Sequence, residues 1–370
     1  MNRTRLSLLS AILLLCAAST AFAHHSHSSL DRNKNVTMSG IVEEFLWTVP
    51  HAYLKVNVPQ DNGEMLEYTI ETMNPPSLSK LGWTRESFQP GDPIMWNGNH
   101  DRDPDRPYTG LQWAQKPGGL RMFTSEQSLA AYIEESGQED LYANASTLQE
   151  IVPATSFPSG YWTRGNATGG RYAPDRAPED DWPYTAKAQA LVDQFHESQN
   201  PLNECIYPGP PRTMLMPMTY HFRWQDDDTI IIDRDLWPEP RVVHMDRSLE
   251  AQEPTAWGHS VGWFEDDVLV VETSDFLADG WGTFIGVDSS EQKHLVERFW
   301  LSDDGMILNM EMTVTDPVYL TEPVTRMHHW NKVEDRDLLS AECSMEAAWF
   351  YITEGYEEGE YEVEVPDFED

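Results

Sequence analysis

Basic residues, cysteine and long apolar segments are all scarce in this chain of 370 residues. Lysine and arginine together number 25, against 62 aspartate and glutamate residues, which gives a formal net charge of −37. Nucleic acids and anionic membrane surfaces need clustered basic side chains, so we expect neither as a partner. After residue 23, no apolar run approaches the ~20 residues that a membrane-spanning helix requires. The acidic balance is typical of a highly soluble protein.

Cysteine occurs three times, and Cys16 belongs to an apolar segment at the amino terminus. The other two, Cys205 and Cys343, would form a disulfide by default in an exported protein. Such a bond would close a loop of roughly 140 residues and contribute roughly 4 kcal/mol in the chain-entropy model. The alternative is a pair of free buried thiols.

Residues 1–23 have the features of a secretory signal peptide. Arg3 and Arg5 provide the positive start, and a short apolar run follows from Leu8 to Ala18. The segment Ala21-Phe22-Ala23 is a small-x-small cleavage site. We therefore expect a periplasmic or secreted protein.

Cleavage after Ala23 would leave a chain that begins at His24, with His25 and His27 close behind. A free amine beside an imidazole can chelate a transition metal, and copper binds most tightly in the usual order, with zinc as the alternative. His51 would add a further imidazole from the first β domain. These four histidines are the candidate metal ligands, in an arrangement chemically similar to that of copper histidine-brace proteins. The alternative is a polar tail that binds nothing, with His51 in a structural role.

The pattern of apolar residues predicts a mainly β protein with a few short helices. Ala52–Val58 alternates apolar and polar side chains, Asp61-Asn62-Gly63 is a hairpin turn, and Met65–Thr72 is the return strand. Five or six such strands within about 100 residues favour a small OB-like barrel. The expected division is a signal peptide at 1–23, an OB-like barrel at 24–123, a helical and irregular connector at 124–204, an antiparallel β domain at 205–354 and an acidic tail at 355–370.

The second β domain contains three strand–turn–strand units at roughly 40-residue intervals. Their turns are acidic: Gln225–Asp228, Glu265–Asp267 and Ser302–Gly305. Because the intervening segments differ in sequence, we expect one antiparallel barrel or sandwich rather than a propeller.

Within this domain, His259 lies in the run Gly258-His259-Ser260-Val261-Gly262, whose letters match the Gly-x-Ser-x-Gly elbow of serine hydrolases. A true elbow joins a strand to a helix, whereas the residues up to Thr273 resemble a hairpin. We therefore expect His259 to form a buried hydrogen bond or to line a cavity.

Charged residues also interrupt the strand patterns of this domain. Arg241 and Glu272, together with His259, are weak candidates for catalysis. These charges either face solvent or line a polar cavity for a ligand that carries a carboxylate. The same alternatives apply to Glu297, Arg298 and Arg326.

Two parts of the chain resemble uncharacterised exported families. Residues 24–123 resemble a bacterial domain with a His-His-Ser start and a Pro-His strand motif, matched here by His24-His25-Ser26, Gly40, Trp47, Pro50-His51, Glu71, Leu81-Gly82-Trp83 and Pro90-Gly91-Asp92. Residues 205–345 resemble a second, β-rich family, matched by Cys205, Pro208–Arg212, Arg241, Met245-Asp246, Gly258–Trp263, Leu269–Thr273, Glu297–Phe299 and Thr315–Pro317. The first resemblance implies export and a small β-barrel, and neither implies an activity.

The leading functional expectation is an exported metal-binding protein, with copper as the expected metal, that uses its mature amino-terminal histidine. The alternatives are a periplasmic enzyme and a lipocalin-like binder of small molecules, each with a cavity in the second β domain. The sequence leaves open whether the protein turns over a substrate and whether the two β domains share one site.

Overall fold

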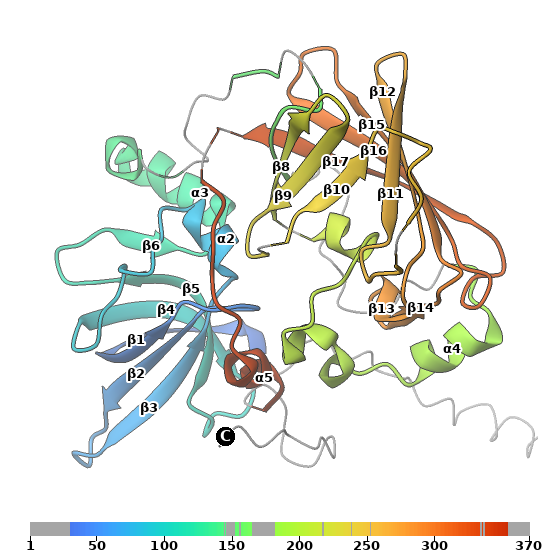
Figure 1. Ribbon diagram of the computed structural model, residues 1–370. Coiled ribbons are helices and arrows are strands. Elements are labelled where there is room, and N and C mark those ends of the chain that lie inside the picture. The colour runs from blue at the N-terminus through green and yellow to red at the C-terminus, as the bar shows by residue number, and fades with distance from the viewer. Residues whose placement is uncertain are drawn as a thin grey trace, which may run out of the picture.

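The computed structural model describes residues 30–143, 145, 152–154, 157–164, 182–216, 218–237, 239–251, 253–333, 335 and 337–353 (Figure 1). The predicted signal peptide, His24, His25, His27 and the predicted acidic tail lie outside these residues. The protein is mainly β, with a small barrel, a larger barrel and few short helices, as the sequence predicts.

The small barrel is built from the first strands of the chain. Neighbouring strands pair in the order β3-β2-β1-β4-β5-β6, and a further parallel pairing joins β3 to β5. Strands β1 to β5 therefore form a closed ring of the OB type. The bounds are β1 (Leu30–Leu46), β2 (Tyr53–Pro59), β3 (Met65–Glu71), β4 (Pro93–Asp101), β5 (Tyr108–Gln115) and β6 (Arg121–Phe123).

Strand β1 closes the ring because it pairs with two partners along its length. Its first part pairs with β4, and its last part pairs with β2 across a register shift between Val42 and Glu44. Gly40 lies at the change of partner, where a Cβ atom would come within 2.6 Å of the Asn57 carbonyl oxygen. Only glycine permits so close an approach of two strands.

Two short helices accompany this barrel. Helix α2 (Pro75–Ser79) begins at Asn74, whose side chain accepts a hydrogen bond from the Ser77 amide. Helix α3 (Glu126–Ser136) begins at Ser125, whose hydroxyl accepts a hydrogen bond from the Ser128 amide, the usual role of serine at a helix start. The 3-10 turn η1 (Glu139–Tyr142) follows α3.

In the described part of the chain, nine strands close into the larger barrel, in the order β10-β11-β12-β15-β16-β17-β7-β8-β9. The three predicted strand–turn–strand units are the hairpins β8–β9, β11–β12 and β15–β16, so a single barrel is confirmed over a propeller. The bounds are β7 (Gly160–Arg164), β8 (Thr219–Asp226), β9 (Thr229–Arg234), β10 (Arg241–His244), β11 (His259–Glu265), β12 (Val268–Ser274), β15 (His294–Leu301), β16 (Ile307–Thr315) and β17 (Val324–Val333).

Large side chains fill the interior of this barrel. Tyr220, Phe222, Phe299, Met310 and Trp330 are buried there and pack against one another, following the period of two along each strand. These side chains form a packed core between the strands of the barrel.

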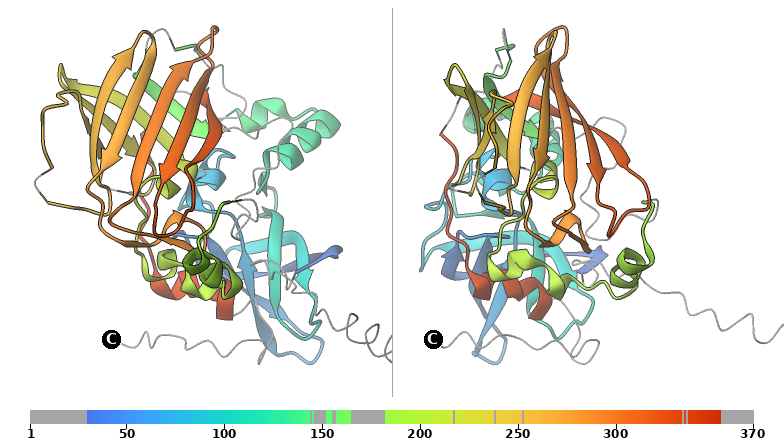
Figure 2. Two further views of the ribbon diagram at one scale, coloured as in Figure 1. Left: turned by 90° about the vertical axis from the view of Figure 1, so that its right-hand side faces the viewer. Right: turned by 45° about the vertical axis from the view of Figure 1, so that its right-hand side comes forward.

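One end of the larger barrel is covered by short elements that face the small barrel (Figure 2). These elements include the hairpin β13–β14, whose Phe284 joins the barrel core, and η5, whose Met214 and Leu215 do the same. The bounds are α4 (Ala186–Asp193), η3 (Glu197–Gln199), η4 (Pro201–Glu204), η5 (Arg212–Leu215), β13 (Asp279–Phe284) and β14 (Val287–Ser289).

The chain returns to the small barrel after β17. The Cys343 backbone forms a bridge with Val49, and the Thr48 hydroxyl donates to the Glu342 carbonyl oxygen at 2.9 Å. Helix α5 (Met345–Thr353) follows and places the Phe350 ring 5.2 Å from that of Tyr53. The carboxyl-terminal segment therefore joins the two barrels.

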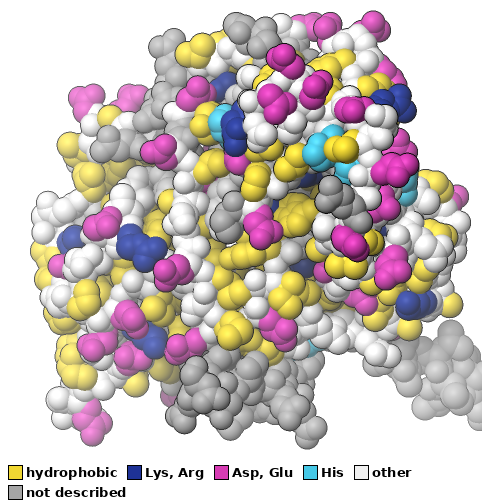
Figure 3. Space-filling view, viewed as in Figure 1, with side chains coloured by type: hydrophobic (Ala, Val, Ile, Leu, Met, Phe, Trp, Pro, Cys, Tyr) yellow, Lys and Arg dark blue, Asp and Glu magenta, His cyan; other side chains and the backbone are white. Residues whose placement is uncertain are grey.

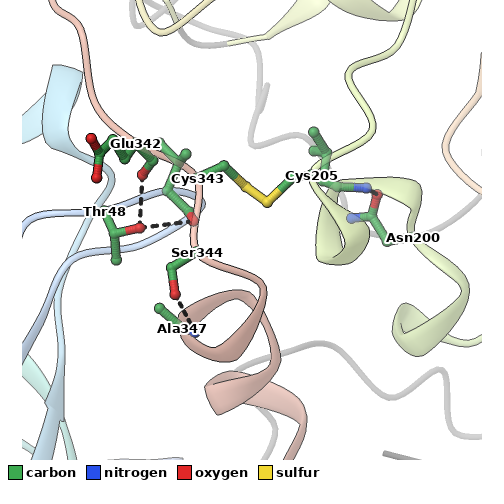
Figure 4. The surroundings of a disulfide bond; sticks show 9 residues. Thr48, Asn200, Cys205, Glu342, Cys343, Ser344 and Ala347 are labelled. Carbon is green, nitrogen blue, oxygen red and sulfur yellow. Dashed lines mark hydrogen bonds between the residues drawn. A yellow bond between two sulfur atoms is a disulfide. The ribbon is translucent and has the colours of Figure 1, made fainter. Parts of the chain in front are cut away.

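A disulfide between Cys205 and Cys343 fastens this segment to η4, as Figure 4 shows. The disulfide expected from the sequence is confirmed, and its cysteines are 138 positions apart in the sequence. Of the helices that the structure describes, none has the length and apolar character needed to span a membrane.

Candidate ligand-binding site

A cavity of about 190 Å³ lies at the junction of the two barrels. Hydrophobic side chains gather between the two units on the face shown in Figure 3. The small barrel and α2 contribute one wall, and the elements that cover the larger barrel contribute the rest. The apolar lining consists of Val49, Pro50, Pro76, Leu202, Tyr207, Leu215, Met216, Met218, Leu236, Trp237, Trp281, Phe284, Ile285 and Cys343.

The small barrel presents His51 to this cavity. The residue is nearly buried, and its Nδ1 contacts the Glu71 carboxylate on the neighbouring strand β3. The second Glu71 oxygen accepts a hydrogen bond from the Tyr108 hydroxyl at 2.8 Å. Because the carboxylate is fixed from both sides, it holds the imidazole in one orientation.

The opposite wall presents Arg212, a buried cation at the start of η5. Its Nη2 donates to the Asn200 side-chain oxygen at 2.8 Å, and its guanidinium lies 5.1 Å from the centre of the Trp281 ring. The Asn200 side-chain oxygen also accepts a hydrogen bond from the Leu202 amide and so caps the start of η4. Glu197 is a buried carboxylate in the same lining.

Lys293 stabilises the wall of the cavity that carries Arg212 and Trp281. Its buried ammonium donates to the Pro210 carbonyl oxygen at 3.0 Å and to the Gly282 carbonyl oxygen at 3.3 Å. It thereby joins the segment before Arg212 to the strand that carries Trp281. Burial lowers the pKa of Lys293 to about 8, against the attraction of nearby Asp279.

The cavity combines a large apolar lining with a few fixed polar groups, which is the usual composition of a small-molecule site. An apolar cavity of about 150 Å³ is enough to hold benzene. The volume here therefore suits a molecule with one aromatic ring or a short apolar chain. His51, Asn200 and Arg212 would orient its polar groups.

The weak catalytic candidates of the larger barrel are separated by the barrel wall. Arg241 is buried and points inward with Ser260, whereas His259 and Glu272 belong to the outward-facing set of their strands. His259 Nε2 contacts the Leu249 carbonyl oxygen at 2.9 Å. Glu272 contacts His294 Nε2 at 2.8 Å near the surface.

The hydrolase-like letters around His259 do not form an elbow. The run continues as strand β11 and turns into β12, as the sequence analysis expects. The Ser260 hydroxyl lies 2.9 Å from the Thr273 hydroxyl and accepts from Arg241 Nε at 3.2 Å. It is therefore part of the packed polar interior of the barrel.

Arg241, an inward charge of this barrel, is paired, as a low-dielectric interior favours. Arg241 Nη2 contacts the Glu297 carboxylate and also donates to the Thr273 hydroxyl at 2.9 Å. Arg298 instead pairs with Glu265 at 2.6 Å on the outer surface. The polar row of Arg241, Ser260, Thr273 and Glu297 crosses four neighbouring strands.

Of the four predicted metal ligands, His51 alone falls within the described residues, and the structure places it in the cavity wall. Among the residues that the structure describes, no group of three or more His, Cys, Asp or Glu side chains is arranged to hold a metal ion. A metal site at His51 would therefore need ligands from outside the described part.

Several residues of the site are not predicted from the sequence. Glu197, Asn200 and Trp237 carry no motif and reach the cavity only through the irregular segments around η3, η4 and β10. Arg212 and Glu71 occur among the residues that carry the family resemblances, but nothing in the sequence gives them a role. The signal in the sequence that could have indicated the site is the density of proline and asparagine between residues 200 and 216.

Residues 11–112 match the model of a family of unknown function, DUF6152. The match covers most of the small barrel, from β1 into β5. No curated protein matches the chain. The small barrel is thus similar to a domain of unknown function.

Proposed function

We propose that this protein is an exported binding protein whose ligand, a small and mainly apolar molecule, occupies the cavity between the two barrels. The observation that carries the proposal is the composition of that cavity. Trp237, Trp281 and Phe284 supply aromatic walls, while His51 and Arg212 supply oriented polar groups from opposite sides. A rigid junction supports such a site, and the disulfide at Cys343 forms part of its lining.

A small fluorinated alcohol, 4-fluorobenzyl alcohol, tests the proposal when it is titrated with the protein and followed by ¹⁹F NMR. The substitution Met216→Trp fills the cavity, and the expected result is binding at least about tenfold weaker than that of the parent, because the added indole occupies the space of the ligand. The titration measures the dissociation constant directly.

Met327→Trp provides the matched control, since Met327 is 57% exposed on the outer face of the larger barrel. The same chemical change there should leave the dissociation constant unchanged. Equal binding by both variants, or no binding by the parent, would contradict the proposal.

Metal binding at the amino terminus is a second candidate, and it is favoured by the position of His51. A metal-bound imidazole usually has its other nitrogen held by a carboxylate, as Glu71 holds His51. The Leu30 side chain packs on Gly110, the register partner of Glu71, so the described chain begins beside this pair. The six residues from His24 to Ser29 span up to about 20 Å when extended, and the candidate requires that this length brings the terminus to His51.

Calorimetric titration of copper into the processed protein tests this candidate. We expect tight binding that is lost when one alanine precedes His24, because the terminal amine then moves away from the imidazole. Glu71→Gln should weaken copper binding by about 10–100-fold through its effect on His51. Equal, weak binding by the parent and the extended variant would rule the site out.

Export is part of the proposal. The signal-like segment at 1–23 supports it, and so does the disulfide, because such bonds persist in oxidising compartments. We therefore place the protein in the periplasm or outside the cell.

A further inference from the structure

Arg234, at the end of β9, is a buried guanidinium that makes no salt bridge and no hydrogen bond in the described residues. Its side chain is 3% exposed, and its Nε and Nη2 atoms are both buried without a hydrogen bond. Two neighbouring carboxylates make their hydrogen bonds elsewhere: Asp233 accepts from Arg223 at 2.7 Å, and Asp235 accepts from the amides of Thr219 and Leu339. Asp233 and Glu239 attract Arg234 only through space, without a salt bridge. Burying an uncompensated charge is costly, so the position calls for a partner.

The side chain is instead held by aromatic rings. Its guanidinium lies 4.0 Å from the centre of the Trp257 ring and 4.9 Å from that of Trp237. Desolvation lowers the pKa of Arg234 to about 10, and the nearby charge of Arg241 adds to the effect. The group therefore stays cationic at neutral pH.

The two atoms without partners form one edge of the guanidinium. Nε and Nη2 point their N–H bonds in parallel, and this side-on edge matches the two oxygens of a carboxylate. Trp237, which packs on Arg234, is also a wall of the junction cavity. Arg234 is not itself among the residues that line the cavity, but it packs directly against Trp237, which is.

We propose that Arg234 is the anion-recognition residue of the junction site, and that the ligand is a small amphipathic carboxylate. Its apolar body lies in the cavity against Trp237, and its carboxylate reaches past this ring to the Nε and Nη2 edge. This inference rests on the proposed binding function and names the chemical class of the ligand.

Two ligands that differ in one group test the inference: 3-phenylpropanoate and 3-phenylpropanol. Calorimetric titration of the parent should show the acid binding at least about tenfold more tightly than the alcohol, since a hydrogen-bonded charge pair forms only with the acid. Arg234→Met should remove this preference and leave the affinity for the alcohol unchanged. Arg234→Lys keeps the cation without the side-on edge and should lose most of the preference.

Arg298→Met serves as the control, because this arginine is paired with Glu265 on the outer surface and should not affect either ligand. The melting temperature measured without ligand distinguishes ligand recognition from a purely structural role, because loss of a structural residue would lower it. The melting temperature of the Arg234→Met variant should equal or exceed that of the parent, because an unpaired buried charge is removed.

The outcomes separate the two proposals. Equal affinity for acid and alcohol, or a preference that survives Arg234→Met, overturns the role of Arg234 and leaves the cavity function intact. If neither the acid nor the alcohol binds, the role of Arg234 and the cavity function are both overturned. A marked fall in the melting temperature of the Arg234→Met variant contradicts the unpaired state on which the inference depends.

Discussion

Replacing Glu297 with leucine should destabilise the protein by about 3–5 kcal/mol, because it leaves Arg241 as an uncompensated charge inside the larger barrel. Both side chains are at most 2% exposed, so the guanidinium that has lost its carboxylate partner cannot be stabilised by solvent. Urea-induced unfolding followed by tryptophan fluorescence gives the free energy of unfolding. A loss below about 1 kcal/mol would mean that the charge finds another partner or reaches water.

The double variant Arg241→Met with Glu297→Leu tests whether the buried ion pair itself stabilises the protein. Arg241 Nη1 and Glu297 Oε1 have no hydrogen-bond partner in the described residues, so the pair recovers only part of its desolvation cost. Ser260 and Thr273 would keep their mutual hydrogen bond when the charges are gone. We therefore expect the double variant to match the parent or to exceed it by about 1–4 kcal/mol.

Removing the disulfide should have a comparably large effect. The bond joins cysteines that are 138 positions apart in the sequence, and the chain-entropy model assigns about 4–5 kcal/mol to a loop of this size. The variant Cys205→Ser with Cys343→Ser should lose roughly that amount in urea unfolding under oxidising conditions, because its unfolded chain is less restricted.

The same variant should also bind small molecules less tightly, since Cys343 lines the cavity and fixes the carboxyl-terminal segment beside Val49. Treating the parent with a reductant should reproduce both effects, while the serine variant should not respond to it. An unchanged free energy of unfolding in the variant would contradict a stabilising role for the bond.

Local patterns carried enough information to predict the two β units. Alternation in Ala52–Val58 and the acidic turns of the larger barrel depend on neighbouring residues only, and the strands follow them closely. Strand β7 was missed, because Gly160–Arg164 lies in a stretch rich in glycine and proline and is recruited by pairing with β17 and β8, far away in the chain.

The junction site could not be predicted from the sequence for the same reason. It is assembled from the start of β2, the turns between 197 and 216 and the segment around Cys343, which meet only in the folded protein. The sequence singles out His51 as a candidate metal ligand, whereas Arg234 and Arg212 look like ordinary strand and turn residues. Only their burial in the folded protein identifies them as candidate site residues.

The most direct test of the account is to locate a bound ligand in a crystal of the protein soaked with 4-bromobenzyl alcohol. The bromine atom provides an anomalous signal that fixes its position without assumptions about the binding mode. We predict one dominant peak within the cavity, among Trp237, Trp281 and Phe284. A peak elsewhere, or an empty cavity at a concentration that saturates binding in solution, would contradict the claim that the junction of the two barrels is the ligand site.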